Sequence, residues 1–140
     1  MKRNLIGILS LVVMSVMLNA PAHAQVAKAD VPFAFKVGSA QLPAGTYEVS
    51  TASDSAVAIH NRQSKVGALS IVRKEYPTKL GARLIFHRVA DQYFLAEIWR
   101  GAGESGMVLP PSKQEKTLQK ELSVAGGQSY TGEEVMIALY

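Results

Sequence analysis

The sequence of 140 residues contains no cysteine, and what it lacks excludes several classes of protein. Without cysteine there is no disulfide framework, no thiol nucleophile and no thiolate ligand for a metal ion. Of its three histidines, His60 and His87 show no spacing typical of metal ligands. Glycine-rich phosphate loops and the Gly-x-Ser-x-Gly elbow of hydrolases are also missing. We therefore expect no catalytic residue, no cofactor and no metal.

The first 24 residues resemble a secretory leader. Lys2-Arg3 forms a basic start, residues 5–18 are apolar and uncharged, and Ala22-His23-Ala24 places small residues where signal peptidase cuts. We expect cleavage after Ala24, which leaves residues 25–140 as one β-rich globular domain exported to the periplasm or the cell exterior. A retained membrane anchor is the alternative, but the apolar stretch is short for a span of about 20 residues.

The exported part is nearly neutral. Once the leader is removed, 13 lysines and arginines face 11 acidic residues, without a dense cluster of either sign. Proteins that bind nucleic acids carry a basic patch, so we expect no nucleic-acid partner. No apolar run after the leader is long enough for a transmembrane span.

Alternating apolar and polar residues, bounded by turn residues, predict strands along most of the exported chain. The predicted strands are 31–37, 46–51, 56–60, 67–72, 84–89, 93–99 and 133–140. Ser112-Lys113-Gln114-Glu115 is typical of a capping box, in which the Ser112 oxygen accepts from the Glu115 N–H and the Glu115 carboxylate accepts from the Ser112 N–H. A helix should run from there to about Ser123. The sequence thus predicts an all-β fold, a small antiparallel sandwich or barrel of six to eight strands with one short helix near the C-terminus.

Three groups of motifs cover most of residues 25–140. They are Val31-Pro32-Phe33 with Leu42-Pro43-Ala44-Gly45-Thr46-Tyr47, Phe86-His87-Arg88 with Asp91-Gln92-Tyr93-Phe94-Leu95 and Ile98-Trp99, and Leu109-Pro110 with Ser112-Lys113 and Glu115. Together they resemble the recurrent pattern of a family of small exported bacterial proteins of unknown function. The resemblance implies export and one compact domain, and it implies no activity, ligand or catalytic residue.

Residues 83–99 predict a hairpin with two distinct faces. If its loop has an even number of residues, one face carries Ile85, His87, Val89, Phe94, Ala96 and Ile98, which we expect to be core. The other face then carries Leu84, Phe86, Arg88, Tyr93, Leu95, Glu97 and Trp99. This second, mixed face is either a buried layer under the helix or a binding surface, whose candidate residues are Arg88, Tyr93, Glu97 and Trp99.

These features favour an exported, non-catalytic β-domain that binds a partner protein or a component of the cell envelope. Two other classes stay open. A cavity of several hundred Å³ lined by the hairpin would favour a small barrel that holds an apolar small molecule between its sheets. A cleft that joins His60 or His87 to a serine and a carboxylate would favour a hydrolase.

Overall fold

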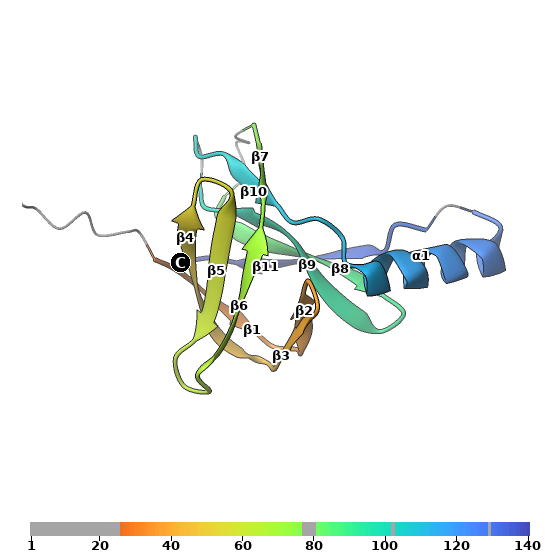
Figure 1. Cartoon of the computed structure of the whole chain (residues 1–140), viewed down its shortest axis with the longest axis horizontal. Helices are drawn as coiled ribbons and strands as arrows, with labels where there is room; N and C mark the ends of the chain where they lie inside the picture. Colours follow the sequence, from red (N-terminus) through yellow and green to blue (C-terminus); the bar gives the residue numbers. More distant parts are fainter. Residues whose placement is uncertain (1–25, 77–80, 102, 129) are drawn as a thin grey trace, which may run out of the picture.

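The computed structural model describes residues 26–76, 81–101, 103–128 and 130–140 (Figure 1). The predicted leader, residues 1–24, lies outside these ranges. Within them the chain forms eleven strands and one helix. They are β1 (Ala27–Val31), β2 (Phe35–Val37), β3 (Ala40–Leu42), β4 (Gly45–Ser53), β5 (Ala56–Asn61), β6 (Val66–Ile71), β7 (Arg73–Glu75), β8 (Arg83–Val89), β9 (Gln92–Trp99), β10 (Gly106–Val108), α1 (Lys113–Gly126) and β11 (Glu133–Ala138).

The strands form two sheets. The smaller has the order β1-β4-β5-β6, and the larger has the order β11-β8-β9-β10-β7 with the β2–β3 hairpin attached to β9. Among the described strands every pairing is antiparallel except that of β2 with β9. The predicted all-β fold with one helix near the C-terminus is therefore confirmed.

The larger sheet curls into a half-barrel, and the two sheets meet at one edge. There the backbones of Lys28 and Tyr140 exchange two hydrogen bonds of 2.9 Å each. Elsewhere the chain passes from β6 in one sheet to β7 in the other across Val72. In Figure 1 the strands β4, β5 and β6 run across the direction of β8, β9 and β11.

Aromatic and aliphatic side chains fill the space between the sheets. The ring of Phe35 packs edge-on against Tyr47 and Phe86, with centroids 5.0 and 5.2 Å away. The Tyr47 hydroxyl donates to the Pro43 carbonyl at 2.6 Å, which satisfies the one polar atom of that buried ring. The interior is thus a packed core built from both sheets.

The number of strands exceeds the predicted six to eight for two physical reasons. Predicted strand 31–37 keeps only its second half, as β2, and shares only Val31 with β1, which lies mostly before it and ends there because Pro32 has no N–H to donate to a ladder. Strands β3, β7 and β10 have three residues each, too few to show an alternating pattern.

The β8–β9 hairpin has an even loop, the condition under which its faces were predicted, but it does not have the predicted faces. Ala90 and Asp91 form its two-residue turn, both with positive φ. The register pairs Phe86 with Leu95 and then Ile85 with Glu97, so Ala96 is an extra residue in β9. Beyond this bulge every β9 side chain lies on the face opposite to the predicted one.

Five of the six residues predicted as core are buried, namely Ile85, Val89, Phe94, Ala96 and Ile98, and only His87 is not, but the other face is buried too. Leu84, Phe86, Leu95 and Ile98 lie in the central core, while His87 lies on the outer face, toward α1. The bulge explains why Ile98 joins Leu84 in the core.

Candidate functional site

The bulge separates the four predicted binding residues into two pairs. Arg88 and Tyr93 pair before the bulge, while Glu97 and Trp99 follow it and share the outer face with His87. Tyr93 stacks on Phe33 with ring centroids 3.8 Å apart. The structure therefore does not bring the four together on one surface, and their role in binding stays a prediction.

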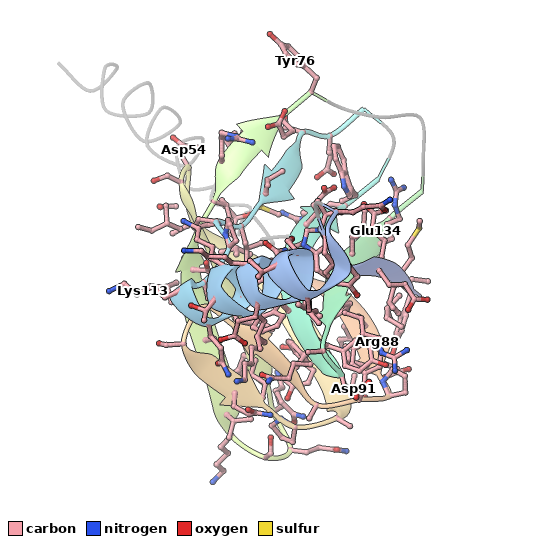
Figure 2. All side chains as sticks on the ribbon, turned by 90° about the vertical axis from the view of Figure 1, so that its right-hand side faces the viewer. Asp54, Tyr76, Arg88, Asp91, Lys113 and Glu134 are labelled. Carbon is pink, nitrogen blue, oxygen red and sulfur yellow. The ribbon has the colours of Figure 1, made fainter. Side chains whose placement is uncertain are left out.

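Arg88 lies at the tip of the hairpin among acidic groups. Its Nη2 donates to Asp91 Oδ1 at 2.9 Å, and its Nη1 lies 3.6 Å from Glu133 Oε2. Figure 2 shows the Arg88 and Asp91 side chains next to each other. Ion pairs with this much exposure contribute little to stability.

Trp99 is a packing residue, since only 6% of its surface is exposed. Its Nε1–H donates to Glu97 Oε2 at 2.7 Å, and the Arg83 guanidinium lies 5.8 Å from its ring. The backbone of Gly106 lies directly against the ring, because a Cβ at that position would come within 2.7 Å of Cε3 and closer still to Cη2. Of the two roles that the sequence left open, burial favours packing for this residue.

Helix α1 begins with half of the predicted capping box. Ser112 Oγ accepts from the Glu115 N–H at 3.1 Å, as expected of an N-cap. The Glu115 carboxylate, however, does not turn back to Ser112. Its Oε1 lies 3.0 Å from His87 Nδ1, and Gln119 Nε2 donates to the same oxygen at 3.4 Å. The reciprocal half of the box is therefore wrong, because a histidine on β8 takes its place.

This contact between His87 and Glu115 attaches α1 to the sheet, and no apolar side chain of the helix is buried there. Glu115 is 3% exposed and is the only buried residue of α1. The hydrogen bond to Glu115 raises the pKa of His87 above its usual value, although burial opposes this. The negative charges of Glu134 and Glu97 raise that pKa further. The first turn of the helix is thus held against β8 by the contact between Glu115 and His87.

A cavity of about 200 Å³ lies between α1 and the outer face of β8 and β9. Three titratable side chains line it, His87, Glu97 and Glu115. The remaining lining residues are Ala96, Val108, Leu109, Pro111, Gln119 and Thr131. We call this space the helix–sheet cavity. Sequence reasoning selected Glu97 but missed Glu115, whose partner lies 28 residues away in the chain.

A second feature lies on the second half of β6, after the inward-facing Val66, where the larger side chains point outward. Leu69 and Ile71 are 69% and 72% exposed, whereas the small residues Ala68 and Ser70 point inward and are half-buried. We call Leu69 and Ile71 the β6 strip. A groove of about 290 Å³ adjoins it, lined by Ile71, Val72, Arg73, Val108, Leu109, Pro110 and Pro111. The sequence predicted the strand but not its orientation.

The described residues contain no group of three or more histidine, aspartate or glutamate side chains placed to hold a metal ion. The one described helix, α1, lacks the length and the apolar character that a membrane span requires. Comparison with protein-family models, curated proteins and solved structures gave no match.

Proposed function

We propose that the chain is an exported, non-catalytic β-domain that binds a partner protein through the β6 strip and the adjoining groove. The observation that carries this proposal is the reversed pattern of β6. A strand of a half-buried sheet normally turns its large apolar residues inward. Here Leu69 and Ile71 point outward, next to a groove lined by Val108, Pro110 and Pro111. Large apolar residues exposed beside a groove are typical of interaction surfaces.

The energy available at the strip is enough to matter for binding. Full burial of one aliphatic side chain contributes about 1.5 to 3 kcal/mol. Because Leu69 and Ile71 are largely exposed, a partner that covered both would gain roughly 2 to 4 kcal/mol from these two residues alone. The rest of the affinity would come from the groove.

The two other classes have less support. A small-molecule barrel needs room between its sheets, whereas that space holds a packed core around Phe35, Tyr47 and Phe86. A hydrolase needs a nucleophile beside its base, whereas His87 contacts the carboxylate of Glu115. Thr131 is the one hydroxyl side chain among the described residues that line their cavity, and no described hydrogen bond joins it to His87.

Export rests on the leader and on the resemblance to a family of exported proteins. Protein recovered from the bacterial envelope should begin at Gln25, because the small residues at 22 and 24 direct the cut there. An intact mass that includes residues 1–24 would contradict this part of the proposal.

Binding is tested with a double variant of the strip, Leu69→Ser with Ile71→Ser. The purified protein is used as bait in envelope extract, and a cross-linked partner is identified by mass spectrometry. Met136→Ser with Val124→Ser is the matched control, since these apolar residues are also exposed but lie on β11 and α1.

We expect the strip variant to lose the partner and the control to keep it, with both unfolding like the parent because exposed sites change stability little. Equal capture by parent and strip variant would refute the proposal. Sedimentation of the purified protein alone shows whether the strip binds a second copy of the chain, which distinguishes self-association from binding of a different protein.

A further inference from the structure

We propose that the partner binds by strand addition, in which an extended segment with alternating apolar residues and acidic ends pairs antiparallel with the free edge of β6. This inference rests on the proposed function, because it states how a partner would bind the β6 strip. Among the described strands only β5 pairs with β6, which therefore ends the smaller sheet (Figure 1). A strand at the edge of a sheet offers a row of unpaired N–H and C=O groups to another chain.

The hydrogen-bond pattern shows which backbone groups of β6 are used by β5. The Val72 N–H donates to the Ser55 carbonyl at 2.9 Å, one step beyond the end of the register between β5 and β6. Hydrogen-bonded pairs alternate along an antiparallel ladder. Ser70 and Ala68 therefore direct their N–H and C=O groups toward β5.

The residues between them, Leu69 and Ile71, direct their N–H and C=O groups to the free edge. Among the described residues, the one hydrogen bond that reaches these groups runs from the Ser70 hydroxyl to the Ile71 carbonyl, at 3.1 Å. The same two residues form the β6 strip, so the free backbone groups and the exposed apolar surface coincide. Proline, lysine or a bulge protects many edge strands, but β6 contains none of them.

A proline keeps this edge open where β10 approaches it. β10 pairs with β7 as far as Val108 opposite Arg73, and the same register continued would set Pro110 against Ile71. Because proline has no N–H to donate, the segment cannot extend the ladder there. A groove of about 290 Å³ lies at this place and is lined by both segments. We therefore place one end of the added strand in this groove.

The charges around the strip select acidic ends in the partner. From Asn61 to Lys74 the chain has four basic residues, on both sides of the strip, and no acidic one. Lys65 is exposed and forms no ion pair with a described residue. Arg62, Arg73 and Lys74 do have acidic partners, but their side chains are more than half exposed and such pairs are weak. A second copy of β6 would bring the same basic residues, so an acidic segment is favoured over self-pairing.

The experiment measures backbone amide exchange by NMR in the purified protein. The probe is the peptide acetyl-Asp-Val-Thr-Val-Thr-Val-Asp-amide, whose valines would lie beside the strip. In the free protein the amides of Leu69 and Ile71 should exchange rapidly, whereas β5 protects those of Ala68 and Ser70. At saturation with the peptide, we expect exchange at Leu69 and Ile71 to slow by about tenfold or more. Exchange at Ala68 and Ser70 should change little.

Two control peptides separate backbone pairing from other contacts. N-methylation of the valines keeps their side chains but removes the N–H groups that would face β6, because residues paired across an antiparallel ladder share a face. This peptide should not bind. Replacement of both aspartates by lysine should weaken binding by roughly three- to tenfold, because repulsion replaces attraction at both ends.

Two variants of one residue test the same pairing on the protein. Leu69→Pro removes the N–H that faces the free edge without removing a bond to β5, and edge strands accept proline in this orientation. Leu69→Ala shortens the side chain but keeps the N–H. We expect the proline variant to bind the peptide about tenfold more weakly than the alanine variant. If circular dichroism shows that Leu69→Pro does not fold, the exchange pattern of the parent decides.

The proposal is overturned if millimolar peptide leaves the Leu69 and Ile71 amides unprotected, or if the N-methylated peptide binds equally well. Protection that grows with protein concentration in the absence of peptide would overturn it in favour of a second copy. The proposed function fails separately, if capture of a partner does not depend on the β6 strip. A captured partner whose complex leaves both amides unprotected would refute strand addition and leave the proposed function standing.

Discussion

Replacement of Trp99 by alanine tests whether the outer face of the hairpin is a packed layer. Nearly the whole indole is buried, between the backbone of Gly106 and the guanidinium of Arg83. Substitution of a buried tryptophan by alanine costs about 3 to 5 kcal/mol, through lost burial and an unfilled cavity. The loss of the hydrogen bond to Glu97 is included in this difference. We therefore expect Trp99→Ala to lower the melting temperature by roughly 10 to 25 °C.

The assay is urea unfolding followed by far-ultraviolet circular dichroism, which does not depend on the deleted fluorophore. Tyr76→Ala is the control, because Tyr76 is 90% exposed and points away from the sheets in Figure 2. It should change the free energy of unfolding by less than about 0.5 kcal/mol. The parent protein should show blue-shifted tryptophan emission that added quencher barely reduces. A cost below about 1 kcal/mol for Trp99→Ala, with emission typical of indole in water, would refute the packing role.

Three further predictions concern single residues. Gly106→Ala should destabilise by about 1 to 3 kcal/mol, because its Cβ would overlap the buried Trp99 ring, and urea unfolding equal to the parent would contradict this. Ala90 is exposed and has φ of 49°, a conformation that is strained for alanine but not for glycine. Ala90→Gly should therefore raise the urea midpoint by an amount equivalent to about 0.5 to 1 kcal/mol, and a lower midpoint would contradict this strain. Because the folded-state pKa of His87 is raised by Glu115, its stabilising contribution is full below about pH 6.5 and is lost as the pH rises through the raised value. Urea midpoints should therefore fall over that range in the parent but not in His87→Gln, and a parallel fall in both would contradict this.

The parts of the fold that could be predicted from the sequence are those fixed by neighbours in the chain. The turn at Ala90 and Asp91 lies between two alternating segments, and the cap at Ser112 needs only the N–H three residues later. Such local hydrogen bonds and periodicities carry the same meaning in many folds. The hairpin and the start of α1 were therefore predicted correctly.

The bulge at Ala96 has no local signal. Whether a strand gains an extra residue depends on what packs against both of its faces, and here one face meets the central core while the other meets α1. A shift of one position moves Glu97 and Trp99 to the opposite face. The binding surface predicted from a regular alternation was divided for this reason.

The contact of Glu115 with His87 shows a second limit of prediction from the sequence. A capping box can be recognised from four residues, but it competes with any partner that the fold brings near the glutamate. The half-buried imidazole comes from β8, and its charge-assisted contact replaces a bond to one backbone N–H. This contact keeps the Glu115 carboxylate against the sheet, where it lines the helix–sheet cavity.

The orientation of β6 is set by its partner strand. Ile59 pairs with Ala68 and Val57 with Ser70 on the inner face, so large residues of β5 fill the space that small residues of β6 leave. The connecting turn holds this register, because the buried Asn61 Oδ1 accepts the N–H groups of two residues that follow it. A shift by one position would bury the β6 strip, but it would oppose large residues to large ones in the core. Core packing therefore determines which face of β6 is exposed. On that face the sequence has leucine and isoleucine, at positions where a polar side chain would be equally compatible with the fold. Core packing explains the small inward residues but not these two, so their exposure is the observation that supports the proposed binding surface.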